Sequence, residues 1–251
     1  MIVKKLFAVL LIGTSAFAAQ AKGIVDNATF TVRLGYSLGG TAPVGLPNTI
    51  RSLNSYHFRP NFLLGLDMSS TIDQRWGWLT GVRVERKGMY VDATVKNYHM
   101  GIEYGGQSLE GYYTGHEVTE EKQLMITVPV QATYHLCHNV SLRLGPYISF
   151  VMTKKFEGYA YDGYLRVNEP TGDKVVMGNT PSNRGSYDFS DRMRSLQCGL
   201  NFGADWRFYR QVGAFAELSW GLNGIHHSDF KTIEQTLYPI YGTIGLTYRI
   251  K

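Results

Sequence analysis

Residues 195–206 read Ser-Leu-Gln-Cys-Gly-Leu-Asn-Phe-Gly-Ala-Asp-Trp, so every second side chain is apolar. Two-residue alternation sends the apolar set to one face of a β-strand and the polar or glycine set to the other. The run is long enough to cross a bilayer, which takes roughly 9–11 residues in a tilted strand. In a water-soluble barrel the polar set faces water, whereas in a membrane barrel the apolar set meets lipid and the polar set lines the lumen. The rest of the sequence has to decide between these arrangements.

The same alternation recurs in eight segments of the chain, residues 29–38, 57–70, 76–89, 123–136, 140–154, 194–208, 212–222 and 238–250. Three of the connections are short, residues 71–75, 137–139 and 209–211, and they alternate with four long ones, residues 39–56, 90–122, 155–193 and 223–237. Short turns at one rim and long loops at the other are typical of outer-membrane barrels. The sequence therefore predicts an all-β fold, a closed eight-stranded antiparallel up-and-down transmembrane β-barrel with short periplasmic turns and four long extracellular loops.

The N-terminus has the features of a secretory signal peptide. Lys4 and Lys5 precede an apolar run, residues 6–19, and Ala19-Gln20-Ala21 is a small-x-small cleavage pattern. The run is too short to span a bilayer as a helix, and a buried N-terminal helix is the alternative interpretation. We expect residues 1–21 to be the signal peptide and residues 22–251 to form one barrel domain. The expected location is the outer membrane, with outer-membrane lipid and the barrel-assembly machinery as partners.

The composition agrees with a membrane barrel. Charged residues make up 18% of the chain, below the globular norm of about 25%. The formal charge of +5 includes two signal lysines and is too weak and too dispersed to suggest binding to nucleic acid. Cys137 lies in a tight turn and Cys198 lies inside a strand that starts from the opposite rim, so we expect no disulfide.

Charged side chains of both signs occupy the face opposite the apolar set. An unpaired buried charge is very costly, and eight strands enclose a bore that side chains can fill, so we expect a lumen plugged by salt bridges. The predicted lumen network consists of Arg33, Asp67, Arg83, Glu85, Lys87, Arg143, Asp205, Glu217 and Arg249. The predicted lipid-facing set consists of Leu64, Leu66, Val82, Val130, Leu144, Leu200, Phe202, Leu218, Ile244 and Leu246. The alternative, a soluble calycin-like barrel, turns Leu200, Phe202, Leu246 and Tyr248 inward and Arg83 and Glu217 outward.

Two groups of residues in the long connections could bind a metal ion. His226 and His227 lie near Asp229, but adjacent histidines of an extended chain point to opposite sides, which favours a solvated loop. The sequence His116-Glu117, followed by Glu120-Glu121, lacks the helical spacing of His-Glu-x-x-His and favours a charged surface loop. We therefore expect no metal and no cofactor.

A catalytic serine, histidine and acid would indicate an enzyme, because some small outer-membrane barrels modify lipid A. His135 lies on the lumen face beside a short turn, and His57 opens a strand. Neither histidine has a serine and an acid placed by sequence to meet it, although such sets are recognised by geometry. We expect that the protein is not an enzyme, with a lipid A-modifying enzyme as the minor alternative.

Three short motifs occur in the third, fourth and fifth predicted strands: Val84-Glu85-Arg86-Lys87-Gly88, Ile126-Thr127-Val128-Pro129-Val130 and Gly145-Pro146-Tyr147. They resemble the end of the third strand, the start of the fourth and a stretch of the fifth in the PorT family of outer-membrane β-barrels. The motifs occur in the family's order, and Thr127 stands where the family has Glu. The resemblance implies a small outer-membrane barrel, and one founding member of the family is linked to a secretion pathway that exports proteases.

The long connections are rich in Tyr and Gly, which are common in adaptable binding surfaces. Loops carry function more often than cores do, and the alternative is that these connections pack on themselves or extend the strands above the membrane. We therefore expect a structural or interaction protein that acts through its extracellular loops. The alternative is an accessory component of secretion or transport across the outer membrane, which would meet a protein partner or a secretion complex through the lipid face or the periplasmic turns.

Overall fold

The computed structural model describes residues 28–43, 45, 48–57, 59–230, 232–233 and 235–250. These residues form strands and one turn of 3-10 helix: β1 (Thr29–Pro43), β2 (Ile50–His57), β3 (Phe62–Thr71), β4 (Trp76–Tyr104), β5 (Gln107–Cys137), β6 (Val140–Val167), β7 (Lys174–Met177), β8 (Gly185–Asp188), η1 (Ser190–Arg192), β9 (Leu196–Tyr209), β10 (Val212–Gly221) and β11 (Leu237–Arg249). Within the described ranges, no helix has the length and apolar character needed to cross a membrane. The predicted signal peptide, residues 1–21, lies outside them.

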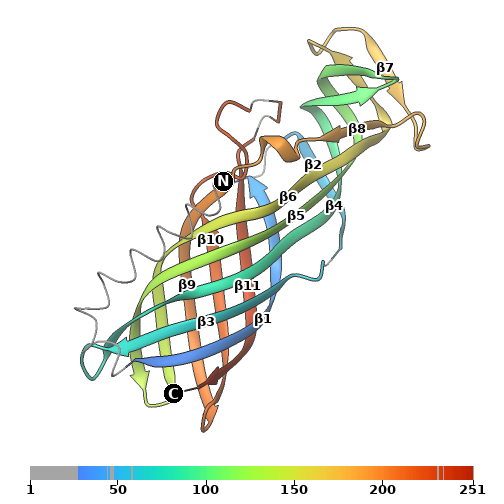
Figure 1. Ribbon diagram of the computed structural model, residues 1–251. Helices are drawn as coiled ribbons and strands as arrows, with labels where there is room; N and C mark the ends of the chain where they lie inside the picture. Colours follow the sequence, from blue (N-terminus) through green and yellow to red (C-terminus); the bar gives the residue numbers. More distant parts are fainter. Residues whose placement is uncertain are drawn as a thin grey trace.

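Eight of the strands close into a ring, seen from the side in Figure 1. The order around the ring is β1, β3, β4, β5, β6, β9, β10 and β11, and β11 pairs with β1 again. Every pairing is antiparallel. Closure gives each of these strands two neighbours along the wall, so no sheet edge is left open there. The predicted antiparallel barrel is confirmed.

The alternating sequence of β9 explains the two faces of the wall. Gln197 and Asn201 are buried inside, whereas Phe202 is exposed outside. Neighbouring strands repeat the alternation in register, since Phe202 lies opposite Leu144 of β6 and Leu218 of β10. The apolar side chains therefore form a continuous outer band, and the polar side chains fill the interior.

The two ends of the barrel differ. At the short-turn end, tight turns over residues 72–75, 138–139 and 210–211 join neighbouring strands. At the other end, β4, β5 and β6 continue beyond the ring, to total lengths of 29, 31 and 28 residues. Figure 1 shows these three strands running together past the rim. We call the outer parts of β4, β5 and β6 (residues 89–104, 107–121 and 154–167), together with β2, β7 and β8, the extension.

The prediction of a loop over residues 90–122 is wrong, because β4 and β5 run through it and meet at the turn Gly105-Gly106. Both glycines have a positive φ, 59° and 79°, which suits a two-residue hairpin turn. Bulges interrupt the alternating pattern by which these strands could be recognised in the sequence. The register shifts between Val95 and Tyr98 of β4 and again between Thr114 and His116 of β5. Each extra residue moves the following side chains to the opposite face and breaks the two-residue period. The predicted long connection over residues 39–56 likewise contains most of β2, and that over residues 155–193 contains β7 and β8.

The extension has a hydrophobic core of its own. Its sheet curls so that β8 pairs with β6 along residues 157–160 and with β4 at Glu103. The buried cluster consists of Val95, Tyr98, Met100, Ile102, Tyr113, Phe156, Ala160, Leu165, Met177, Tyr187, Met193, Ile225 and Ile233. A core of this size makes the extension a folded layer rather than a set of separate loops.

Candidate functional site

Six charged side chains form a closed ring across the lumen, in which positive and negative groups alternate. In order around the ring they are Arg33, Asp67, Arg83, Glu217, Arg143 and Asp205. We call this set the ion ring. Arg33 Nε donates to Asp67 Oδ2, and its Nη1 and Nη2 donate to the two oxygens of Asp205 at 2.6 and 3.1 Å. Such a two-pronged contact is the strongest geometry for an arginine–carboxylate pair.

The other two arginines complete the ion ring in the same way. Arg83 donates to Asp67 at 2.9 and 3.1 Å and to Glu217 Oε1 at 2.7 Å. Arg143 lies 2.6 Å from Glu217 Oε2 and 2.7 Å from Asp205 Oδ2. Every arginine therefore bridges two carboxylates and every carboxylate bridges two arginines. The three positive and three negative charges balance, which removes most of the cost of placing them in an enclosed bore.

Glycines on the inner face make room for the ion ring. An added Cβ at Gly81 would lie 2.4 Å from Asp67 Oδ1, and one at Gly203 would lie 2.8 Å from Arg143 Nη2. A side chain at either position would push a charged group away from its partner. The glycines on the lumen face therefore leave space that the charged groups occupy.

A second layer fills the lumen between the ion ring and the extension. Lys87 Nζ lies 2.5 Å from Glu85 Oε2 and packs over the rings of Tyr147 and Tyr241, at 5.6 and 5.5 Å from their centroids. Beyond this layer, Glu121 accepts a hydrogen bond from Thr41 Oγ1 at 2.6 Å, and Gln197 donates to Gln123 at 2.6 Å. Sequence reasoning missed these last four residues, although Gln123 and Gln197 lie in phase with the predicted lumen positions.

The structure brings eight of the nine predicted lumen residues together in these two layers and places the ninth elsewhere. Arg249 is exposed at the short-turn end and belongs to neither layer. It is the last residue of β11, two positions beyond Thr247, so it extends past the packed part of the bore. Alternation identified its face correctly but carries no information about depth along the barrel axis.

All ten predicted lipid-facing side chains lie on the outer face of the wall, with 41–62% of their surface exposed. The soluble alternative requires Leu200, Phe202, Leu246 and Tyr248 inside and Arg83 and Glu217 outside. The structure has the reverse arrangement, because those four side chains are exposed and the two charged ones are buried. A continuous exposed apolar band around a closed barrel needs an apolar solvent.

Comparison with known proteins agrees with this geometry. The family model described as outer membrane protein beta-barrel domain matches residues 18–227 of the chain. The chain belongs to this family. Outer-membrane barrels have their short turns on the periplasmic side and their long connections on the outer side, and the same orientation is expected of this chain. No curated protein matches the chain.

Three bacterial proteins are among the solved structures to which the chain is similar. One is Ail, the attachment invasion locus protein of Yersinia pestis, which was solved in complex with the heparin analogue sucrose octasulfate. Ail is 11% identical to this chain, the match covers 89% of this chain and 97% of Ail, and the TM-score is 0.36. CarO2 of Acinetobacter baumannii is 10% identical over 88% of this chain and 99% of that one, with a TM-score of 0.40. The translocator domain of the autotransporter NalP from Neisseria meningitidis is 9% identical over 98% of each chain, with a TM-score of 0.25.

The outer face of the extension carries a hydrogen-bonded network that crosses four strands. Asn54 of β2 donates to Asp92 of β4 at 2.9 Å and lies 3.1 Å from His116 Nδ1 of β5. Thr94 Oγ1 of β4 lies 3.3 Å from the same nitrogen. Tyr161 of β6 donates to Asp92 at 2.7 Å and stacks on His116 with 5.2 Å between ring centroids. We call these five residues the outer network; they are exposed or half-buried.

The histidines that sequence analysis considered as metal ligands have other surroundings. His226 packs between Phe156 and Phe230, with ring centroids 4.7 and 5.0 Å away. Burial, together with the neighbouring His227, lowers the pKa of His226 from 6.5 to about 4. His116 belongs to the outer network. The part of the chain that the structure describes contains no group of three or more His, Cys, Asp or Glu side chains arranged to hold a metal.

His135 has a serine partner that the sequence pattern did not reveal. Its Nδ1 lies 2.7 Å from Ser141 Oγ, because the two residues face each other across the β5–β6 turn. Its Nε2 is buried and has no hydrogen-bond partner among the described residues. Asp205 lies opposite Ser141 on β9, but Arg33 and Arg143 hold its carboxylate. The arrangement is a serine–histidine pair without an acid that orients the imidazole.

Proposed function

We propose that this outer-membrane barrel is a sealed anchor that presents the extension to a partner at the cell surface. The observation that carries the proposal is the outer network, in which side chains from four strands are fixed in place above the membrane before any partner arrives. A binding surface that is already ordered loses little conformational entropy when it binds. Loops without a core would lose that conformational entropy when they bind the partner.

The core of the extension supports this role. Tyr113, Phe156 and Leu165 are fully or almost fully buried there, although the membrane-spanning ring is already closed without them. Tyr113 OH also donates to the backbone oxygen of Tyr161 at 2.6 Å and lies 3.2 Å from that of His116, directly beneath the outer network. Burial of these large side chains stabilises the sheet independently of the membrane. It therefore supports a rigid platform rather than a mobile fringe.

The filled lumen supports an anchor rather than a pore. The ion ring and the layer around Lys87 occupy the bore, and the charges within them are paired. A route for solutes would require breaking several buried ion pairs at once, each at a cost of about 3–5 kcal/mol. Function is then expected at the two ends of the barrel and on its outer surface.

The PorT-like alternative, an accessory role in secretion, rests on the three sequence motifs. One of them supplies Glu85 and Lys87 of the second layer, and another supplies Tyr147, over which Lys87 packs. These contacts give the motif residues a role in filling the lumen. A secretion role would therefore use the lipid face or the periplasmic turns. The minor alternative, a lipid A-modifying enzyme, rests on His135 and Ser141.

Site-specific photo-crosslinking in the native membrane separates the first two proposals. We would place benzoylphenylalanine at Lys96, an exposed residue two positions beyond Thr94 of the outer network, at Leu200 on the lipid face and at Gln211 in a periplasmic turn. A discrete protein or glycan adduct at Lys96, absent at the other two positions, is the expected result. Adducts at Leu200 or Gln211 without one at Lys96 would instead favour a secretion complex and contradict the proposal.

A paired variant tests whether the outer network itself binds. Tyr161→Phe removes only the hydroxyl that donates to Asp92, and His116→Ala removes the stacked ring beneath it. We expect the double variant to form a heat-modifiable barrel like the wild type, because neither side chain belongs to the buried core. A crosslinker at the nearby Lys96 should then lose its adduct. An unchanged adduct would show that the outer network is not the binding surface.

A further inference from the structure

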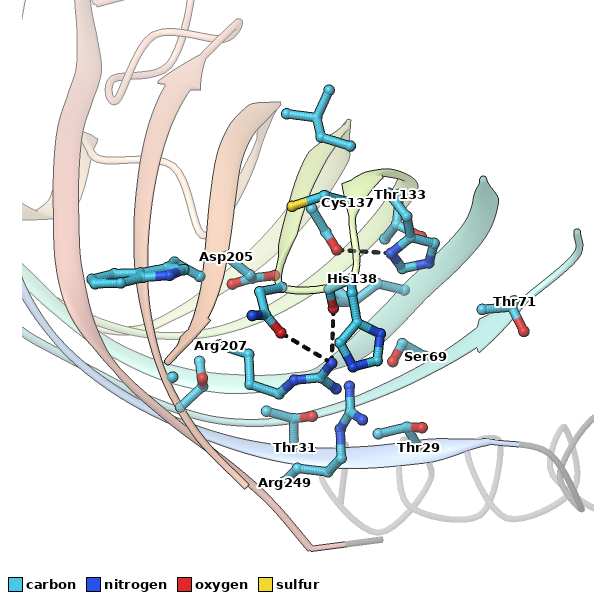
Figure 2. A pocket seen from close by; sticks show the side chains of 18 of the residues that line it. Thr29, Thr31, Ser69, Thr71, Thr133, Cys137, His138, Asp205, Arg207 and Arg249 are labelled. Carbon is cyan, nitrogen blue, oxygen red and sulfur yellow. Dashed lines mark hydrogen bonds between the residues drawn. The ribbon is translucent and has the colours of Figure 1, made fainter. Parts of the chain in front are cut away.

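A cavity of about 560 Å³ occupies the lumen at the periplasmic end, and Figure 2 shows its lining from close by. Arg33 and Asp205 of the ion ring form its inner end, so it is open on the periplasmic side only. Hydroxyl-bearing side chains contribute much of the wall, among them Thr31, Ser69 and Thr133. Its volume lies within the range of small-molecule sites, roughly 300–1,000 Å³.

Two arginines face this cavity from strands on either side of β10. Arg207 comes from β9, opposite Gly213 of β10, and Arg249 comes from the end of β11, two residues beyond Thr247, which faces Gly213 from the other side. Gly213 brings no side chain to the wall beside Arg207, and an added Cβ there would lie 2.7 Å from Thr247 Oγ1. Figure 2 shows Arg207 and Arg249 in the lining of the cavity, and Arg207 is near enough to repel Arg249 electrostatically.

No carboxylate of the described residues neutralises these two arginines. Arg207 donates to the backbone oxygen of His138 at 2.7 Å, and neither arginine forms an ion pair within the described part of the chain. Asp205 is the one acidic side chain in the described lining, and Arg33 and Arg143 already hold it. Like charges that share a half-enclosed space raise each other's energy, and a bound anion would remove that repulsion.

We propose that this cavity binds a small soluble anion that carries more than one carboxylate or phosphate group. The planar guanidinium matches both kinds of oxyanion with two parallel N–H donors, and Arg207 and Arg249 offer two such forks. The hydroxyls of the wall can hydrogen-bond a polar scaffold between the anionic groups. Because the ion ring closes the inner end, the anion enters and leaves from the periplasm and does not pass through the barrel.

Cys137 provides a direct reporter, because it is an exposed thiol in the lining of the cavity. We would prepare Cys198→Ser protein in phosphatidylcholine nanodiscs and compare a negatively charged with a positively charged methanethiosulfonate reagent. The positive field should make the anionic reagent react faster, on the order of tenfold. Citrate or inorganic phosphate should slow the reaction. Equal rates, or no protection by either anion, would overturn the proposal.

Titration calorimetry of citrate and of inorganic phosphate then measures binding itself. We expect citrate to bind more tightly, with an affinity that falls with salt and is about tenfold weaker in Arg207→Gln and in Arg249→Gln. Arg51→Gln, an exposed arginine on β2 at the opposite end, is the matched control and should bind like the wild type. Heat-modifiable migration checks that each variant folds. Equal affinity in all four proteins would refute the role of the arginines.

The same titration separates a soluble anion from a lipid headgroup. Nanodiscs that contain phosphatidylglycerol present phosphate at the rim of the cavity, whereas phosphatidylcholine nanodiscs present no net negative charge. Citrate binding that is equal in both supports a soluble ligand. Citrate binding that disappears with phosphatidylglycerol would show that the cavity takes a headgroup and would overturn the soluble ligand.

Discussion

Replacing Glu217 with Gln should strongly destabilise the barrel. The Glu217 carboxylate is almost fully buried and accepts hydrogen bonds from Arg83 at 2.7 Å, from Arg143 at 2.6 Å and from Gln131 at 3.3 Å. Gln has the same shape but no charge, and its NH₂ group faces the two arginine donors if its oxygen turns away. The ion ring would then hold three positive and two negative charges in an enclosed bore.

The magnitude follows from the loss of two buried ion pairs. Arg83 would keep Asp67, and Arg143 would keep Asp205 and Gln131, so each arginine loses part of its partner set and neither becomes fully isolated. Breaking one partner of a buried pair costs about 3–5 kcal/mol. That is a large share of a typical total stability of about 5–15 kcal/mol. We therefore expect a loss of about 3–5 kcal/mol in the free energy of unfolding.

Reversible urea unfolding in lipid vesicles measures this loss, with fluorescence from the exposed Trp76, Trp206 and Trp220 as the signal. Adding Arg143→Gln to Glu217→Gln removes one charge of each sign and restores neutrality. We expect the double variant to lose about 1–3 kcal/mol less than the sum of the single variants. Glu157→Gln, which breaks an exposed pair with Lys155, is the control and should change little. A Glu217→Gln loss below about 1 kcal/mol, or strict additivity of the pair, would refute the closed ion ring.

Three further predictions test other parts of the structure. The wild-type protein in a planar bilayer should show no steady channel, since Lys87, Tyr147 and Tyr241 fill the bore, and a large steady conductance would contradict this packing. In a Cys137→Ser, Cys198→Ser background, a lipid-soluble thiol probe should label Leu200→Cys and not Asn201→Cys; labelling at the second position would reverse the two faces. The pKa of His226 is about 4 in the folded extension and 6.5 when the side chain is exposed to water. As the pH falls from 6.5 toward 4, only the opened form takes up a proton. The folded form therefore loses stability relative to the opened form over that pH range. The protection factors of the β8 amides, which correct for the slower intrinsic exchange at acid pH, should therefore be lower at pH 4.5 than at pH 7, and His226→Phe should remove most of that change.

The barrel could be predicted from the sequence because the membrane imposes one rule along every spanning strand. Each outward residue has to be apolar, and a narrow lumen accepts polar groups and glycine, so Phe202 and Asn201 reveal their faces without any knowledge of their neighbours. The same rule placed Arg33, Asp67, Arg83, Arg143, Asp205 and Glu217 in one enclosed space. Alternation gives no depth along the axis, which is why Arg249 was assigned to the same network.

The extension could not be predicted in the same way because it lies outside the membrane, where the apolar side chains point inward instead of outward. Within the ring, Phe150 of β6 is exposed on the outside, whereas farther along the same strand Phe156 and Leu165 are buried on the inside. The change of face coincides with a bulge, since Leu124 lies opposite Thr153 but Met125 lies opposite Val151. A strand that changes both its phase and its solvent has no single period for a sequence pattern to report.

The pairing of His135 with Ser141 shows a second limit of sequence reasoning. The two residues are six positions apart and meet only because the β5–β6 turn is tight enough to place them in register. The register also places Asp205 beside Ser141, but the Asp205 carboxylate is paired with arginines of the ion ring. Which acid is available therefore depends on a network of six residues from six strands, and such a competition is visible only in three dimensions.

The filled lumen separates the two proposed sites. The outer network and the periplasmic cavity lie at opposite ends, and the ion ring and the Lys87 layer between them have paired charges that a distant ligand cannot shift without breaking buried contacts. A ligand couples two sites only if it binds two states of the intervening structure with different affinity. Arg207→Gln should therefore leave photo-crosslinking at Lys96 unchanged, and Tyr161→Phe should leave citrate binding unchanged. Cross-talk between the two would mean that the lumen has a second packing, and the ion ring would then be a switch rather than a plug.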